Sequence, residues 1–379
     1  MKDNQAKYPQ LRFKGFTDPW EKRSLDEITT KTKSYSLSRD VERDHETGYR
    51  YIHYGDIHTG VADASEDYQG IAEPAVVVGL PTQHLVAGLH TIALRPSSAS
   101  SLYLYYLLHT ESFKHFGYQT GTGLKVFGIS WSNLSKFTFM IPSRPEQEKI
   151  VKLIESVDNL TSDNQRKLAK LKELKQGYLQ KLFPKNGSKF PQLRFTGFAD
   201  AWEERKLGDI FVYKQGQQVP VENQFTKRGK NRHRFIRIVD LTTNNEAPRY
   251  IEYSGDNIIS STDLFMIRYG QPGVIGYGYE GVIANNLFKL IPKIETYNLF
   301  FKYILDSMYP KIQSLSSSTT MPAISFKSLD VLAVRYPNKK EQEKIGSFFA
   351  QLDNTIALHQ RKLEKLQELK KGYLQKMFC

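Results

Sequence analysis

Hydrophobic residues recur at alternating intervals of four and three along two long stretches of this chain. The first stretch is 146–183, and the second, 341–378, begins 195 residues later and aligns with the first without a gap. This spacing predicts an α-helix with one apolar stripe that packs along a partner helix. At about 1.5 Å per residue, each helix would be about 57 Å long, whereas ordinary helices have about a dozen residues.

The two apolar stripes have matching positions, so each helix offers a seam to the other. The seam residues are Ile150, Ile154, Val157, Leu168, Leu171 and Tyr178 in the first helix, and Ile345, Phe349, Leu352, Leu363, Leu366 and Tyr373 in the second. Polar residues interrupt the first seam at Thr161, Asn164 and Lys175. We expect the two helices to form a coiled coil within one chain; the alternative is two core helices in separate domains.

Each long stretch starts with a sequence typical of a helix N-terminus. Ser143 precedes Glu146 by three residues, and Asn338 precedes Glu341 by three, which predicts a capping box at both starts. The run from Glu146 to Lys149 also resembles the E-x-K end of a metal-dependent nuclease site. No paired acidic motif lies upstream, so helix capping and the helix dipole are the favoured explanation for these carboxylates.

A second repeat precedes the helices. Residues 8–28 return as 190–210, with the shared pattern P-Q-L-R-F-x-G-F-x-D-x-W-E-x-R-x-L. Trp20 and Trp202 are expected to pack in a core, with ligand stacking as the alternative. The chain is therefore built twice, as a lead-in, a variable region and a long helix. If the helices pair antiparallel, a pseudo-twofold axis relates the halves.

The variable regions predict mixed α and β structure. Strands are expected at 51–57, 75–78, 91–94 and 137–141, then at 235–241, 264–268 and 282–284, with helices at 102–116 and 299–312, the second interrupted near Pro310. The fold class is α+β, with two α/β-type domains separated by two long helices. The expected boundaries are 1–143 and 186–337 for the domains, and 144–185 and 338–379 for the helices.

Composition and charge limit the classes of partner that this chain is expected to bind. The chain has 379 residues, a net charge of +13 and one cysteine, Cys379. The basic excess favours a polyanionic partner, usually nucleic acid. An anionic membrane surface is the competing interpretation, but no apolar run is long enough to span a bilayer and no signal segment is evident. A single cysteine excludes disulfides within the chain and fits a cytoplasmic protein.

No catalytic motif emerges from the sequence. The run GYGYEG at 276–281 matches the dinucleotide fingerprint, but the following residues predict a strand instead of the required helix, so we interpret it as a glycine-rich hairpin. The chain has neither a G-x4-G-K-[ST] phosphate loop nor an Asn-Pro-Pro-aromatic methyltransferase motif, and its nine histidines show no metal-ligand spacing.

The strongest candidate for DNA contact is the basic run KRGKNRHR at 227–234, for which a solvated charged loop is the alternative. Lysine and arginine here would neutralise phosphates, while arginine, asparagine or glutamine would reach base edges. The candidates in the second half are Lys227, Arg228, Lys230, Asn231, Arg232, Arg234, Gln217 and Gln218. Those in the first half are Lys31, Lys33, Arg39, Arg50, Gln83, Gln119 and Lys125.

Taken together, the paired lead-ins, the repeated EQEKI…QRKL…GYLQK helices and the YIHYGDI segment resemble the specificity (S) subunit of type I restriction–modification systems. The resemblance covers essentially the whole chain. It implies two target recognition domains, each binding half of a split, asymmetric DNA sequence, and an antiparallel coiled coil that sets their spacing. One departure is that DLFMIRYG at 263–270 has only a weaker counterpart, EPAVVVG at 73–79, in the shorter first domain.

The same resemblance implies the partners and cofactors. Two methyltransferase subunits, which use S-adenosylmethionine, would dock on the helices, and restriction subunits, which use ATP and magnesium, would join them. This chain itself would bind double-stranded DNA, no metal and no cofactor, and would catalyse nothing. The rival functions are a coiled-coil scaffold with non-specific nucleic-acid binding, and an enzyme with an unrecognised site. A steep salt dependence without sequence preference would indicate the scaffold.

Overall fold

The computed structural model describes residues 7–37, 48–52, 73–77, 84–122, 128–185, 187–243, 245–317 and 322–378. The chain divides into two compact units. Unit 1 consists of 1–165 and 361–379, and unit 2 consists of 166–360. Each long helix therefore contributes one segment to each unit, and each unit combines a globular domain with segments of both helices.

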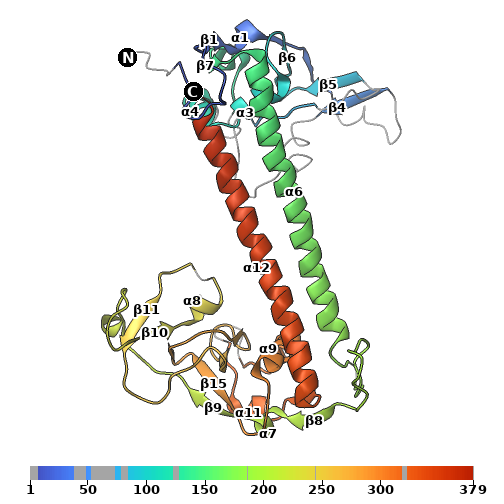
Figure 1. The fold of residues 1–379 in the computed structure, drawn as a ribbon, viewed down its shortest axis with the longest axis vertical. Coiled ribbons are helices and arrows are strands. Elements are labelled where there is room, and N and C mark those ends of the chain that lie inside the picture. Colours follow the sequence, from blue (N-terminus) through green and yellow to red (C-terminus); the bar gives the residue numbers. More distant parts are fainter. Residues whose placement is uncertain are drawn as a thin grey trace. The chain divides into compact units, whose positions relative to one another are not determined.

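The long helices are α6 (Arg144–Lys181) and α12 (Lys339–Lys376). Within each unit, the first part of one helix lies beside the last part of the other, so the helices run antiparallel (Figure 1). Ile150, Ile154 and Val157 of α6 are buried, as are Ile345 and Phe349 of α12. The predicted intramolecular antiparallel coiled coil is confirmed.

Salt bridges occupy the positions where lysine interrupts the seam. In unit 1, Lys370 lies 2.7 Å from Asp158, which also accepts a hydrogen bond from Tyr106 at 2.9 Å. Unit 2 repeats this arrangement with Lys175 and Asp353 at 2.5 Å, and with Tyr303 donating to Asp353 at 2.8 Å. Each lysine thus joins the helix pair to a tyrosine of the globular domain.

The starts of both long helices are where the sequence predicts. Asn338 accepts a hydrogen bond from the backbone N–H of Glu341 at 3.1 Å, as its capping box predicts, but the glutamate half of both boxes is wrong. Glu146 is 1% exposed, and its carboxylate accepts hydrogen bonds from Arg12 at 2.7 and 2.8 Å and from Trp20 at 3.3 Å. Glu341 accepts from Arg194 at 2.8 and 2.7 Å in the same way. A bidentate guanidinium–carboxylate pair is stronger than a bond to a backbone N–H, so each carboxylate turns to the lead-in.

The glutamine that follows each of these glutamates forms hydrogen bonds between the long helix and its globular domain. Gln147 accepts a hydrogen bond from the backbone of Ser100 at 2.9 Å and donates to Pro142 at 2.9 Å. Gln342 makes the equivalent pair, accepting from Tyr297 at 3.0 Å and donating to Pro337 at 2.8 Å. The Glu-Gln pair that begins each repeat is therefore a buried polar anchor.

The domain of unit 1 consists of small sheets and short helices. The strands are β1 (Glu21–Ser24), β2 (Thr29–Lys31), β3 (Ser34–Tyr35), β4 (Tyr49–Ile52), β5 (His84–Gly88), β6 (Leu94–Pro96) and β7 (Thr138–Ile141). The helices are α1 (Leu25–Ile28), α3 (Ser101–Leu107), α4 (Glu111–Thr120) and α5 (Trp131–Leu134). The pairings are β1 with β7, β2 with β6, and β3-β5-β4.

Unit 2 has larger sheets. Its strands are β8 (Glu203–Lys206), β9 (Phe211–Gln215), β10 (Arg232–Ile236), β11 (Arg249–Glu252), β12 (Leu264–Ile267), β13 (Ile275–Gly276), β14 (Val282–Ile283), β15 (Leu287–Pro292) and β16 (Ala333–Tyr336). Its helices are α7 (Leu207–Ile210), η2 (Val221–Asn223), α8 (Ile238–Leu241), α9 (Asn298–Ser307), α10 (Tyr309–Ser314) and α11 (Phe326–Asp330). The sheet orders are β13-β12-β15-β9, β11-β10-β14 and β16-β8.

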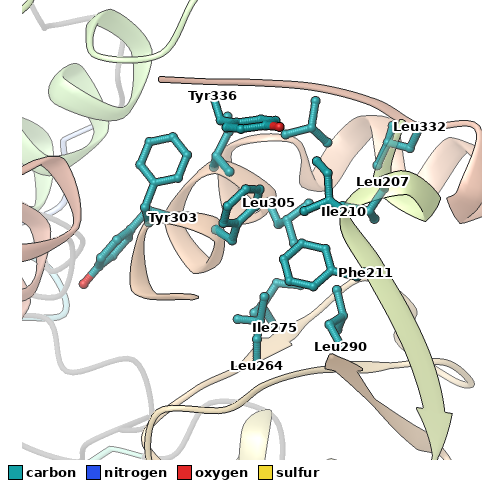
Figure 2. Packing of buried hydrophobic residues seen from close by; sticks show 14 of the residues in the cluster. Leu207, Ile210, Phe211, Leu264, Ile275, Leu290, Tyr303, Leu305, Leu332 and Tyr336 are labelled. Carbon is teal, nitrogen blue, oxygen red and sulfur yellow. The ribbon is translucent and has the colours of Figure 1, made fainter. Parts of the chain in front are cut away.

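The core of each unit forms where the lead-in meets the long helices. Trp20 is 3% exposed and packs with Ile150 and Phe378, and Trp202, at 2%, packs with Phe183 and other aromatic residues. The packing role predicted for both tryptophans is confirmed. Figure 2 shows part of the unit 2 core, with side chains from α7, α9 and the four-stranded sheet. A separate small core lies under the β11-β10-β14 sheet.

Several predicted elements differ in detail. The strand expected at 75–78 is wrong for its described residues 75–77, and the one expected at 91–94 lies slightly later, as β6. The helix expected at 102–116 is two helices, because Thr110 caps a new start by accepting from the backbone of Phe113. Of the strand expected at 51–57, residues 51–52 lie in β4 and the rest lie outside the described residues.

The region around 235–241 also departs from prediction, because β10 ends at Ile236 and α8 follows. The cause is Asp240, which accepts from the backbone N–H of Arg237 at 2.8 Å and so starts a helix. The GYGYEG run is not a hairpin, because β13 pairs with β12 whereas β14 pairs with β10. No helix follows it, so the rejection of a dinucleotide site stands. Among the described residues, no helix is long and apolar enough to cross a membrane.

Candidate nucleic-acid interface

The basic run of unit 2 forms a tight turn that leads into β10. The backbone N–H of Arg232 donates to the carbonyl of Gly229 at 3.2 Å, and Asn231 has a positive φ of 62°. Asparagine tolerates this left-handed conformation better than most residues. Lys227, Arg228 and Lys230 are exposed, and none forms an ion pair with another residue in the described part of the chain. The turn therefore presents three uncompensated positive charges.

The two arginines after the turn have partners within unit 2. Arg232 stacks its guanidinium 3.4 Å from the centre of the Phe225 ring and lies 3.5 Å from Glu252. Arg234 lies 3.1 Å from Asp240. These contacts hold both side chains against the β11-β10-β14 sheet, whereas the turn residues remain available to a partner.

Asp240 organises the end of β10. Its carboxylate is 1% exposed and lies 3.1 Å from Arg234 and 3.4 Å from Arg237. Arg237 also pairs with Glu246 at 2.7 Å. A buried carboxylate between two guanidinium groups fixes their positions, since removing it would leave Arg234 without its ion-pair partner and Arg237 with Glu246 alone.

A surface groove of about 390 Å³ lies beside this network. Its polar lining consists of Gln218, Gln224, Arg237, Asn285 and Asn286. Val219, Phe235, Ile238, Val239 and Ala284 supply its apolar lining. The loop after β9, the end of β10, α8 and the turn between β14 and β15 all contribute to it, so it is formed by segments that are far apart in the sequence.

The structure places the two predicted glutamines of this half differently. Gln218 is exposed and lines the groove. Gln217 is half-buried, and its backbone donates to Ile283 and accepts from Asn285, both at 2.8 Å. Gln217 thus anchors the loop on β14, while Gln218 points to the groove.

The candidates of unit 1 are spread over several elements. Lys31 ends β2 and is exposed, and Lys33 lies with its ammonium 5.0 Å from the centre of the Tyr35 ring. Gln119 lies in the last turn of α4, where it bonds to His115 at 2.8 Å. Arg50 lies in β4. Arg39, Gln83 and Lys125 lie outside the described residues.

Among the residues that the structure describes, no group of three or more His, Cys, Asp or Glu side chains could hold a metal ion. The polar lining of the groove is mainly amide, with one arginine that is paired to two carboxylates. Such a lining offers hydrogen-bond donors and acceptors to a ligand and no nucleophile.

Two parts of the chain match the model of one known protein family. The model of the type I restriction modification DNA specificity domain matches the chain twice, over residues 17–176 and 199–368. These two matches cover most of the chain and follow its internal repeat. The chain belongs to this specificity family. Each match includes one recognition domain and most of the long helix that follows it.

Two curated relatives that match most of the chain are named as specificity subunits of type I restriction enzymes. The chain is 24% identical over 351 residues to a putative type I restriction enzyme specificity subunit, MjaX, of Methanocaldococcus jannaschii, covering 88% of this chain and 79% of that protein. It is 22% identical over 294 residues to the MjaVIII specificity subunit of the same organism, covering 71% and 67%.

Solved structures show the same fold. A type I restriction–modification S subunit from M. genitalium matches with a TM-score of 0.63 at 18% identity, covering 98% of this chain and 99% of that one. A second match, with a TM-score of 0.50 and 18% identity, comes from a study of complex assembly and conformational transition of the type I R-M system, and covers 79% and 77%. The specificity-subunit architecture therefore extends along the whole chain.

The sequence did not point to Asn285, Asn286, Gln224 or Arg237 as site residues. The pair Asn285-Asn286 follows the short strand β14, where asparagine is typical of a turn. Asp240, three residues after Arg237, was a capping signal that would have ended the preceding strand. Their common groove depends on contacts between distant segments, which no local pattern predicts.

Proposed function

We propose that this chain is the DNA-specificity subunit of a type I restriction–modification complex, in which each recognition domain binds one half of a split, asymmetric target. The observation that carries the proposal is a repeated frame with different domains on it. Both units use the same Arg–Glu pair, the same glutamine anchor and the same Lys–Asp–Tyr contact. Between these shared contacts, the two variable regions differ in sequence and length.

In this proposal the chain contributes recognition and geometry, and its partners contribute the chemistry. Two methyltransferase subunits would use S-adenosylmethionine, and restriction subunits would use ATP and magnesium. The chain would bind none of these and would catalyse no step. The coiled coil would set the gap between the half-sites, because two recognition domains on one face of DNA need a separation related to its helical repeat of about 34 Å.

The complex offers a direct test. Methylated adenines would be mapped across the genome in cells with and without this chain, with the methyltransferase subunit present in both. We expect methylation in a split motif with a constant gap that disappears when the chain is removed. Methylation that is unchanged without the chain would contradict the proposal. Binding that falls steeply with salt and shows no sequence preference would indicate the non-specific scaffold instead.

The basic turn is expected to bind DNA phosphates. Replacing Lys227, Arg228 and Lys230 together by glutamine should weaken binding and lower the slope of log K against log salt by up to about three, since each lost phosphate contact accounts for about one. The preference among target sequences should stay the same, because phosphate contacts carry no base information. The measurement is a salt titration of binding by the assembled complex.

A matched variant controls for net charge in the same unit. Replacing Lys327, Lys311 and Lys293 by glutamine removes the same number of charges from exposed or partly exposed positions outside the basic turn. This variant should lower the salt slope much less. Equal effects of the two triple variants would show that only the overall charge matters.

The lead-ins supply a surface that is repeated in both units and lies beside the long helices. The backbone N–H of Leu11 donates to Lys376 at 2.8 Å, and that of Leu193 donates to Lys181 at 2.9 Å. The side chains of Leu11 and Leu193 are 41% and 42% exposed. Tyr8 and Phe190, three residues earlier in each lead-in, are also exposed. An apolar surface present twice suits two copies of one partner, so we assign it to the methyltransferase subunits.

A pair of substitutions tests this assignment. Leu11→Asp should leave one methyltransferase subunit on the chain instead of two, Leu193→Asp should do the same, and the double variant should retain none. A buried, unpaired carboxylate at each contact is the physical reason. The masses of the assembled complexes, measured by native mass spectrometry, give the result. Complete assembly of the double variant would contradict the assignment.

The control is Leu358→Asp. Leu358 is an exposed leucine of α12, and the equivalent position of α6 is Asp163. An apolar contact made twice cannot include a position where one copy is already aspartate. Leu358→Asp should therefore assemble with two methyltransferase subunits.

A further inference from the structure

We infer that the groove of unit 2 is a base-reading site, in which Gln218, Asn285 and Asn286 bind an adenine-containing part of the half-site in the major groove. The inference rests on the proposed function and makes it specific to three side chains. Within the described part of the chain, the side-chain amides of Gln218, Asn285 and Asn286 form no hydrogen bond.

The backbone that carries these amides is held firmly. The N–H of Asn285 donates to Gln217 at 2.8 Å, and the carbonyl of Asn286 accepts from Arg268 at 2.8 Å. The side chain of Gln215 donates to the carbonyl of Asn285, and its oxygen accepts from Arg268 at 2.7 Å. A fixed backbone is a partly preorganised frame, because a ligand then has to order only the amide side chains and not the loop that carries them.

The charge distribution in the groove favours binding to base edges over binding to phosphates. Its one charged residue, Arg237, pairs with Asp240 and Glu246, so its positive charge is compensated. The amides are neutral and offer paired donors and acceptors. Asparagine and glutamine form bidentate hydrogen bonds with N6 and N7 of adenine, and apolar side chains contact the methyl group of thymine. Val219, Ile238 and Ala284 supply such apolar contacts in the same groove.

The basic turn and the groove lie at opposite ends of one strand. The turn precedes β10, and Phe235 and Arg237, near the end of β10, line the groove. Five residues at about 3.3 Å each separate them by about 17 Å. The major groove is about 12 Å wide and is flanked by phosphates, so a turn on the phosphate backbone would place the amides over base edges. One strand would thus connect phosphate binding to base recognition.

The test uses the full chain assembled with its methyltransferase and a pool of randomised DNA duplexes. The wild-type complex should select a split target with at least one A·T pair in one half-site. At least one of three alanine variants should lower this preference by about 5- to 150-fold and leave the other half-site unchanged. These variants are Asn285→Ala, Asn286→Ala and Gln218→Ala. Asn285→Asp and Asn286→Asp keep the side-chain shape and should shift the preference toward cytosine, whose N4 donates to a carboxylate.

Several outcomes would overturn the inference. A wild-type complex that selects no split target removes the proposed function and the inference with it. If all five variants select the same split target as the wild type, the groove does not read bases, but the proposed function still holds. A change in both half-sites would also exclude a local base contact. Gln218 is exposed, so its alanine variant should fold normally, and Asn354→Ala, an exposed asparagine of α12 outside the groove, should select the wild-type target.

Discussion

Replacing Glu146 by alanine is expected to destabilise unit 1 by about 3–5 kcal/mol, the typical cost of leaving one partner of a buried ion pair alone. The Glu146 side chain is 1% exposed and accepts three hydrogen bonds, two from Arg12 and one from Trp20. Without the carboxylate, the Arg12 side chain, which is 15% exposed, loses its ion-pair partner and keeps a hydrogen bond to the carbonyl of Asp18, and the indole N–H of Trp20 loses its bond to Glu146. The hydrogen bond to Glu146 is also the main reason that the pKa of Arg12 is raised. Arg12 stays charged even without this bond, because a guanidinium is not deprotonated in proteins.

Chemical denaturation of the full chain, with hydrogen exchange to locate the loss in unit 1, measures the effect. Glu148→Ala is the control, because Glu148 is exposed and its pair with Arg144 is an ordinary contact along one helix turn. Its removal should cost less than about 0.5 kcal/mol. Similar effects of the two substitutions would show that the buried pair does not anchor the lead-in.

The two units should respond unequally. Glu341 pairs with Arg194 as Glu146 pairs with Arg12, but the indole N–H of Trp202 makes no hydrogen bond with any described residue. Glu146→Ala deprives both an arginine and a tryptophan of a partner, whereas Glu341→Ala deprives only an arginine. Glu341→Ala should therefore lower the free energy of unfolding by less than Glu146→Ala does. The double variant Arg12→Leu with Glu146→Leu should be more stable than Glu146→Ala alone, because no unpaired charge remains.

The long helices were predictable because their signal is local and is repeated twice. A seam with intervals of four and three residues needs no knowledge of distant contacts, and the second copy identified the partner helix. The lysines in the seam looked like imperfections. Their explanation required Asp158 and Asp353 of the opposite helix, which the structure places 2.7 and 2.5 Å away.

The Glu-Gln anchors were misinterpreted for a related reason. A glutamate three residues into a helix satisfies a capping box as well as any other N-terminal role. Its actual partner, Arg12, precedes Glu146 by 134 residues. The evidence was present in the repeat, since Arg12 and Arg194 recur in the lead-ins as Glu146 and Glu341 recur in the helices. Two charges of opposite sign that recur together are a signal of pairing.

The candidate DNA contacts were only partly predictable. High positive charge identified the turn at 227–230, but charge alone did not show that Arg232 and Arg234 have partners within the domain. The amides of the groove carry no charge, so composition does not reveal them. Recognition surfaces that act through neutral amides are therefore harder to predict from sequence than phosphate-binding surfaces, although they carry the sequence information.

Deleting one heptad from each long helix is expected to shorten the gap of the DNA target. The deletion would remove Thr161–Lys167 from α6 and Arg361–Gln367 from α12, which keeps the four-and-three spacing of both seams. Seven residues correspond to about 10 Å of helix, or about three base pairs of DNA. Lys370 should still reach Asp158, and Lys175 should still reach Asp353, because both helices shorten equally.

Affinity should fall even for the shortened target. Seven residues are close to two full helix turns and hardly rotate the coiled coil, whereas three base pairs rotate DNA by about 100°. The complex must therefore twist its DNA to bind both half-sites, and that deformation costs free energy. Selection from randomised duplexes with gaps of every length measures both effects. An unchanged gap would show that the helices do not set the spacing.

The control deletes the heptad from α6 alone. This variant shifts one helix against the other by two turns, so the pair of Lys370 with Asp158 and the pair of Lys175 with Asp353 cannot both form. It should lower the melting temperature and abolish selection of any split target, because the two domains lose a defined separation. A double deletion that binds a shorter gap, beside a single deletion that binds none, would identify the paired helices as the element that measures the DNA.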